Sequence, residues 1–168
     1  MMRIRPIACL GAALALSVLT AWPAQAAGET SAVCSVLMSV GFSPGLTMTP
    51  GSGTKGTDGE SGSISCQGRI NGHHVTGPGT FGFEGTYTAS SCLSGTGSGT
   101  YFGTVPTDAG PMQFSGTFSQ TWIGLVFQIE AEQPGARFTA TAVGVPTEGE
   151  CIRTPLTQAA ASMTAFGR

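Results

Sequence analysis

The feature of this chain that most limits its fold is a strict alternation of side chains between residues 31 and 42. The even positions are apolar, whereas serine and glycine dominate the odd positions. The apolar residues are Ala32, Cys34, Val36, Met38, Val40 and Phe42. Because successive side chains of a β-strand point to opposite faces, this period of two predicts a half-buried strand with Cys34 pointing inward.

Similar short runs follow along the chain. Strands are expected over residues 63–70, 80–86, 99–105, 112–120 and 138–142. A phase change near residues 122–124 is expected to start a further strand, with Ile123, Leu125, Phe127 and Ile129 facing inward. The last run, residues 152–166, fits either a helix, which its three consecutive alanines favour, or an edge strand. No run in residues 27–168 has a convincing helical period, so we predict an all-β fold of about eight strands.

Glycine stands next to aromatic residues in several of these runs, as in Gly79-Thr80-Phe81 and Gly116-Thr117-Phe118. Aromatic rings that cover neighbouring glycines are typical of strongly coiled sheets. A closed antiparallel sheet uses such curvature and removes its exposed edges. We therefore predict a single antiparallel β-barrel, with a two-sheet β-sandwich as the alternative.

Two adjacent histidines follow the strongest turn signal in the chain, Asn71-Gly72. This pair suits a two-residue hairpin whose central residues both have positive φ. The hairpin would pair Ile70 with His73 and Arg69 with His74, which places His73 on the inward face. Since neighbouring side chains point in opposite directions, the two imidazoles cannot bind one metal ion together.

The stretch from Thr49 to Gly62 has almost nothing to bury, and we expect a long solvated loop there. Within it, residues 51–57 lack the adjacent Gly-Lys of a phosphate-binding loop, because Thr54 precedes Lys55.

The N-terminal 26 residues have the three parts of a secretory signal peptide. Arg3 and Arg5 precede an uncharged apolar run, and Ala24-Gln25-Ala26 supplies small residues for cleavage. Residues 27–168 would then form one β-barrel domain, secreted to the extracellular side of the envelope. Loss of both arginines takes the formal charge from −2 to −4, which disfavours nucleic acid as a partner. We expect a monomer without a membrane span after cleavage.

Four cysteines remain after cleavage, namely Cys34, Cys66, Cys92 and Cys151. An even number in an exported chain predicts two disulfides, and no pair has the close spacing of a structural zinc site. Three pairings are possible. Because Cys34 and Cys66 both point inward from strands joined by one loop, we favour Cys34 with Cys66 and Cys92 with Cys151.

Several separate motifs resemble those of small secreted Gly/Thr/Ser-rich β-proteins that are common in high-GC Gram-positive bacteria and whose function is uncharacterised. The motifs are GFSPGLT (41–47), GSISCQG (62–68), CLSGTGSGTY (92–101), GEC (149–151) and PLT (155–157). The resemblance implies an exported β-protein and supplies no catalytic residues. A looser similarity to allene-oxide-cyclase-like barrels implies closure of the sheet, but not that activity.

Three functional hypotheses follow, none with a cofactor or a metal site. The favoured one is a non-enzymatic barrel that binds a small apolar ligand, an envelope component or a protein. The second is a small isomerase or hydrolase in which His73, beside Glu84 or Glu130 at the barrel mouth, acts as general base. For His73 itself we favour the role of a hydrogen-bonded core histidine over this catalytic one. The third is a protease inhibitor that presents the loop around Cys92.

Overall fold

The computed structural model describes residues 29–167, which form ten β-strands and no helix. The strands are β1 (Ser31–Leu46), β2 (Gly51–Gly56), β3 (Gly62–Ile70), β4 (His73–His74), β5 (Gly79–Ser90), β6 (Ser94–Thr107), β7 (Gly110–Ile123), β8 (Val126–Gln133), β9 (Ala136–Glu148) and β10 (Leu156–Gly167). The predicted signal peptide, residues 1–26, lies outside the described residues. None of the described residues belongs to a helix that could span a membrane.

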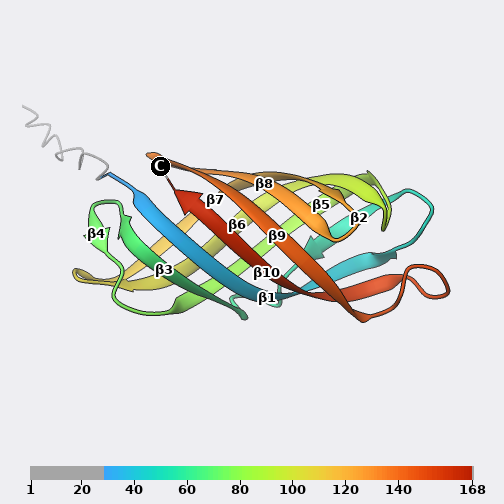
Figure 1. Ribbon diagram of the computed structural model, residues 1–168, viewed down its shortest axis with the longest axis horizontal. Coiled ribbons are helices and arrows are strands. Elements are labelled where there is room, and N and C mark those ends of the chain that lie inside the picture. The colour runs from blue at the N-terminus through green and yellow to red at the C-terminus, as the bar shows by residue number, and fades with distance from the viewer. Residues whose placement is uncertain (1–28, 168) are drawn as a thin grey trace, which may run out of the picture.

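All ten strands belong to one antiparallel sheet that closes on itself (Figure 1). Strands β5 to β10 follow one another as neighbours, β10 pairs with β1, and β3 joins β1 to β5. The closed ring has eight strands, with β2 and β4 as additional short strands. The predicted all-β fold and its closed antiparallel sheet are confirmed, and the sandwich alternative is not adopted.

One position in the ring is divided between two strands. Strand β3 pairs with the first half of β1, residues 31–37, whereas β2 pairs with residues 41–43 further along the same strand. On the other side, β5 pairs with both strands in the same way. The connection at residues 57–61 leaves the sheet between β2 and β3, so the wall of the ring is interrupted there.

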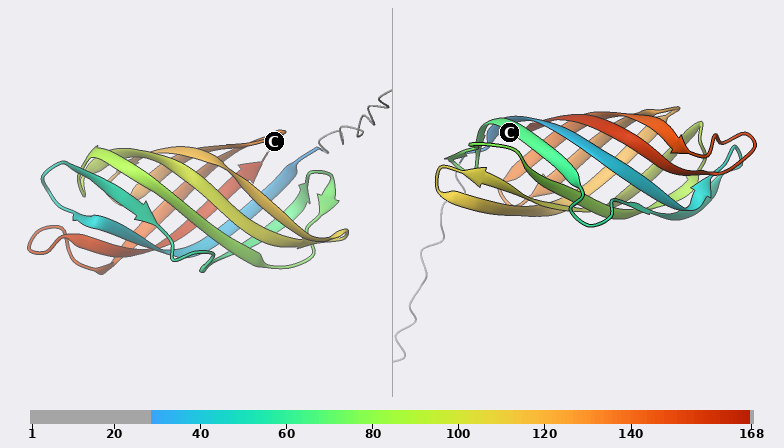
Figure 2. Two further views of the ribbon diagram at one scale, coloured as in Figure 1. Left: turned by 180° about the vertical axis from the view of Figure 1, so that it is seen from behind. Right: turned by 90° about the horizontal axis from the view of Figure 1, so that it is seen from below.

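The two ends of the ring differ (Figure 2). At one end β1 begins beside the end of β10, where Ala32 pairs with Gly167. We call this the terminal end. The opposite end carries the connections 47–50, 91–93 and 149–155, and the disulfide between Cys92 and Cys151 joins two of them. We call it the disulfide end.

The alternation in β1 has the predicted effect on packing. Val36 is 1% exposed. Cys34 of β1 lies directly opposite Cys66 of β3, with 4.0 Å between their Cα atoms. These two cysteines form the first disulfide, and Cys92 with Cys151 forms the second, which is the pairing favoured from the sequence. Two disulfides are compatible with an extracellular protein.

Three local expectations are wrong. Residues 51–56 form β2 instead of a solvated loop, because their backbone pairs with β1 and β5 on both sides. Ile123 does not start an inward face: it pairs with Val126 across a tight turn and is 80% exposed, and Leu125 lies in that turn, also exposed. Residues 156–167 form neither a helix nor an edge strand, because β10 pairs with β9 and β1 and closes the ring.

Candidate functional site

The closed sheet encloses a cavity of about 120 Å³. Its wall consists of the inward side chains of almost every strand of the ring, and nearly all of them are apolar. The lining residues include Val36, Val40, Phe42, Phe81, Phe83, Phe118, Phe127, Ile129, Ala140, Ala161 and Met163. A cavity of roughly 150 Å³ with a similar lining takes up benzene, so this one is suited to a small apolar molecule.

Among the described residues that line this cavity, one is charged, Lys55. Its neighbour Thr54 is exposed on the outer face, and the period of two in β2 turns Lys55 into the ring. Its backbone lies opposite Phe42 of β1 and Gly85 of β5. The side chain is only 4% exposed. A lysine is seldom buried to this degree without an ion-pair partner.

The ammonium group of Lys55 lies among aromatic rings. Its Nζ is 5.2 Å from the ring centroid of Phe118 and 5.4 Å from that of Trp122. Within residues 29–167, Nζ has no hydrogen-bond partner and no carboxylate at ion-pair distance. The two π faces are its main electrostatic support. Burial lowers the pKa of Lys55 from 10.5 to about 7.

Glycines on the inner face of β5 and β6 make room for this side chain. Gly85 pairs with Gly99, and Gly97 lies two residues before Gly99 on the same face. A Cβ atom added at Gly97 would lie 2.4 Å from Nζ of Lys55. The Gly-Thr-Gly-Ser-Gly run of β6 therefore leaves the space that the lysine occupies.

A glutamine lies beside the buried amine. Gln120 pairs with Gly97 across β6 and β7, between Phe118 and Trp122 on the inward face, and it lines the cavity. The other polar residues of the wall, Tyr101 and Gln133, are linked by a hydrogen bond of 3.5 Å that the Tyr101 hydroxyl donates. Burial raises the pKa of Tyr101 to about 12, so this hydroxyl stays neutral.

A groove of about 800 Å³, with both polar and apolar lining, runs over the outer surface beside β2. Its wall includes Glu84, Glu148 and Thr157, and it shares Phe42 and Lys55 with the cavity. The cavity therefore lies on the inner side of the sheet and the groove on its outer side, at the end of β2. This is the part of the ring that the 57–61 connection interrupts.

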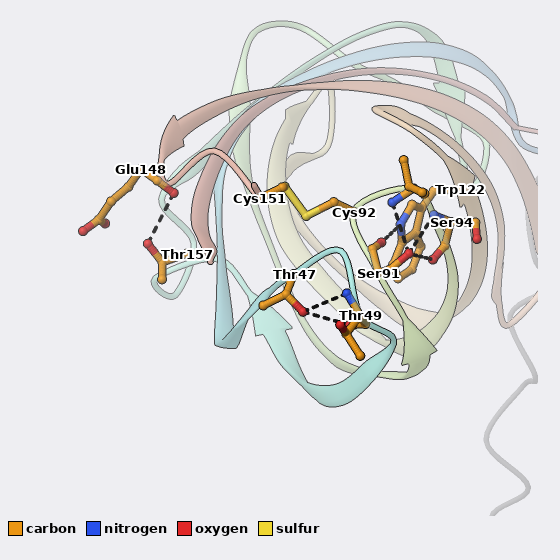
Figure 3. Close-up of a disulfide and its surroundings, with 10 residues drawn as sticks. Thr47, Thr49, Ser91, Cys92, Ser94, Trp122, Glu148, Cys151 and Thr157 are labelled. Atoms are coloured by element: carbon orange, nitrogen blue, oxygen red, sulfur yellow. Dashed lines mark hydrogen bonds between the residues drawn. A yellow bond between two sulfur atoms is a disulfide. The ribbon is translucent and has the colours of Figure 1, made fainter. Parts of the chain in front are cut away.

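Loops at the disulfide end fix the position of Trp122 (Figure 3). The indole Nε1 donates a hydrogen bond to the Ser91 carbonyl oxygen at 3.1 Å. The next residue, Cys92, donates its backbone N–H to Thr47 O at 2.9 Å and forms the disulfide with Cys151. The disulfide thus holds the loop that positions one of the two aromatic rings at Lys55.

The histidines lie elsewhere. Ile70 pairs with His73 and Arg69 with His74, and both Asn71 and Gly72 have positive φ, so the predicted hairpin is confirmed. The expected inward position of His73 is wrong, because β4 is only two residues long and nothing covers it. The His73 side chain is 49% exposed, and its Nδ1 lies 3.5 Å from Asp108 Oδ1. It lines neither the cavity nor the groove.

Sequence reasoning missed Lys55 because a lysine among glycines and threonines resembles a solvated loop. Two signals could have identified it. It is the only lysine of the chain, so it does not belong to a set of solubilising surface lysines. It also stands two residues after Gly53 and four after Gly51, a period of two that glycine conceals because it has no side chain.

Comparisons with protein-family models, curated proteins and solved structures give no significant match to this chain.

Proposed function

We propose that this is a secreted, non-enzymatic binding protein that holds a small apolar ligand inside its ring of strands. The observation that carries this proposal is the cavity of about 120 Å³ whose wall is almost wholly apolar. Water gains little in such a space because it finds few hydrogen-bond partners, whereas an apolar molecule gains dispersion contacts with the apolar wall.

The two other hypotheses have less support. A general base needs a substrate site within hydrogen-bond reach, and His73 lies at the surface away from the cavity and the groove. The loop around Cys92 has only three residues, 91–93, between β5 and β6. Although Leu93 at its tip is 58% exposed, so short a turn offers no extended segment to a protease cleft.

Methionine methyl groups provide a direct test of ligand binding. Met38 and Met163 line the cavity, whereas Met48 lies outside it and is exposed. We expect benzene or toluene to shift the NMR methyl signals of Met38 and Met163 in a saturable manner. The Met48 signal serves as an internal control and should not move.

A pair of variants on β10 separates cavity binding from surface binding. Ala161 lines the cavity, and its neighbour Ala160 is exposed on the opposite face. Ala161→Phe should abolish the shifts by filling the space, and Ala160→Phe should leave them intact. Shifts of equal size in both variants, or none in the unmodified protein, would contradict the proposal.

A further inference from the structure

We infer that Lys55 captures the ligand covalently, as a reversible imine with a small apolar aldehyde. This inference rests on the proposed function, since it requires a ligand in the cavity. It goes further by naming the reactive group of the ligand and the atom of the protein that binds it.

The position of the amine is the first argument. Nζ is packed against the rings of Phe118 and Trp122, beside the apolar cavity that Lys55 lines, and within the described chain it forms no hydrogen bond or ion pair. Such an unpaired amine opposes folding, because the desolvation of the charge is not offset by a partner. A bound molecule that reacts with Nζ relieves this cost.

The state of the amine is the second argument. Imine formation needs a neutral amine, and a lysine desolvated in an apolar pocket is activated as a nucleophile. Burial brings the pKa of Lys55 to about 7, so a large fraction is neutral near neutral pH. In free solution almost every lysine is protonated there.

The supply of hydrogen-bond donors decides between an aldehyde and a carboxylate. A buried carboxylate has about four acceptor positions and needs several donors. Beside the Lys55 amine the wall provides only the amide of Gln120, because Tyr101 and Gln133 bond to each other further along the cavity. An imine is neutral and needs no counter-ion, which suits this wall.

The chemical step is balanced by the two reactants alone. The neutral amine adds to the carbonyl carbon, and the N–C bond forms as the C=O π bond opens. The two amine hydrogens then leave with the carbonyl oxygen as one water molecule, and a C=N bond remains. The groove on the outer side of the wall also borders Lys55 and Phe42, so the residue that reacts stands between the cavity and the groove.

The size of the cavity limits the aldehyde to roughly the bulk of a benzene ring. Benzaldehyde is therefore the probe, and glycolaldehyde is the polar control. The full chain is treated with each aldehyde in the presence of cyanoborohydride, which reduces an imine to a stable secondary amine. Peptide mapping by mass spectrometry then locates the adduct. Lys55 is the only lysine, so the N-terminal amine is the only other primary amine.

We expect benzaldehyde to modify Lys55 at least about tenfold faster than glycolaldehyde does, because only the ring gains contacts in the apolar pocket. The N-terminal amine should show no such preference. Ala161→Phe, which keeps the lysine but fills the cavity, should lose the adduct, whereas Ala160→Phe should retain it. Equal reaction of Lys55 with both aldehydes, or an unchanged rate in Ala161→Phe, would overturn the inference.

A second measurement separates this inference from the proposed function. In protein labelled with ¹⁵N-lysine, Nζ of Lys55 gives the only lysine side-chain signal. Benzaldehyde should convert that signal to an imine nitrogen. If benzoate instead holds Nζ as an ammonium group and benzaldehyde forms no imine, the ligand is an acid and the inference is wrong. If benzene shifts the Met163 methyl but benzaldehyde forms no adduct, the proposed function stands without it.

Discussion

At the scale of single residues, the molecule depends on the contrast between Lys55 and its surroundings. A long cationic side chain is buried in an apolar interior, and within residues 29–167 its charge is supported only by the rings of Phe118 and Trp122. Cation–π contacts of this kind contribute about 1 to 2 kcal/mol each, less than the cost of removing an ammonium group from water. The structure retains this residue at a cost in stability.

The depressed pKa of Lys55 predicts how stability varies with pH. The unfolded chain holds the lysine proton up to a pH near 10.5, whereas the folded protein releases it near 7. Unfolding therefore takes up a proton between these values, and the free energy of unfolding rises as the pH increases through this window. Of the other titratable groups nearby, Tyr101 is on the cavity wall, and Glu84 and Glu148 are on the groove.

Replacing Lys55 by methionine should remove this dependence. At about pH 6 we expect Lys55→Met to be more stable than the unmodified protein, by at most about 4 to 5 kcal/mol, since one pKa unit corresponds to roughly 1.4 kcal/mol. The advantage should shrink towards pH 10. Urea unfolding at both pH values measures it, with Arg153→Met, at an exposed cation, as the control. A variant no more stable than its parent at low pH would contradict the buried charge.

Gly97 gives a second prediction at this scale. A Cβ at this position would meet both Nζ of Lys55 and the Thr86 carbonyl oxygen, at 2.4 and 2.7 Å. Gly97→Ala should therefore destabilise the protein by about 1 to 3 kcal/mol, the usual range for overpacking. In a double-mutant cycle with Lys55→Ala, part of this loss should disappear, because the shortened side chain no longer competes for the space. If the two losses of stability are strictly additive, a Cβ at position 97 and the Lys55 side chain do not compete for the same space.

At the scale of elements, the divided position between β2 and β3 is the main departure from a regular ring. The 57–61 connection is tied to β5, since Thr57 donates its N–H to Phe83 O and accepts the Phe83 N–H at Oγ1, both at 3.0 Å. The Thr57 hydroxyl also donates to Gly59 O at 2.6 Å. One threonine side chain thus secures the connection beside the interrupted wall.

Thr57→Val tests this role with little change in shape. We expect a loss of roughly 1 kcal/mol in unfolding free energy, the usual contribution of a hydrogen bond. The larger effect should be local, because the Phe83 amide loses its acceptor and should exchange its hydrogen faster than the rest of β5. Thr86→Val, at an exposed position of the same strand, is the control. An unchanged hydrogen-exchange rate at the Phe83 amide would show that the hydrogen bond to Thr57 Oγ1 does not hold the connection in place.

The predictability of each element from sequence follows from the side chains that it carries. Strand β1 was foreseen because its alternation is explicit, and the β3–β4 hairpin because Asn71-Gly72 specifies its turn. Strand β2 was missed because glycine fills most positions that would reveal a period. At Ile123 the new strand is expected too early, because the turn at Gly124 and Leu125 fits the inward period of the residues that follow it. The tertiary contacts that decide these cases, such as the pairing of β2 with both neighbours, leave no local signal.

The site was less predictable than the fold. Pattern reasoning assigns a lysine to the exposed face, and it names His73 as the one catalytic candidate because imidazole is a versatile catalytic group, while it favours a core position for that residue. The closed sheet reverses both assignments. His73 is left at the surface by a strand too short to be covered, and Lys55 is drawn inside by the register of β2.

At the scale of the whole molecule, two disulfides reinforce a glycine-rich ring. Cys34–Cys66 ties neighbouring strands within the wall, and Cys92–Cys151 ties two connections at the disulfide end, with sequence separations of 32 and 59. Glycine loses much backbone freedom on folding, so a ring of this composition gains most from constraints on the unfolded chain.

Removal of the second disulfide should affect stability and the site together. For Cys92→Ser with Cys151→Ser, loop-closure entropy sets the loss at up to about 4 kcal/mol. The loop that accepts the Trp122 indole hydrogen bond should loosen, and the tryptophan fluorescence should move towards that of an exposed indole. Cys34→Ala with Cys66→Ala should cause a similar loss without this spectral change. Identical fluorescence spectra for the two double variants would show that the Cys92–Cys151 disulfide does not position Trp122.

The closure of the ring by β1 and β10 leaves the two ends of the described chain next to each other, with Val33 opposite Phe166. A short linker could therefore join residues 29 and 167, and new termini could be opened in an exposed turn such as Gly124-Leu125. Circular permutation of this kind is tolerated where termini are adjacent and the new break is on the surface. A partner fused at residue 29 or 167 would lie at the terminal end and would leave the disulfide end of the ring exposed to solvent.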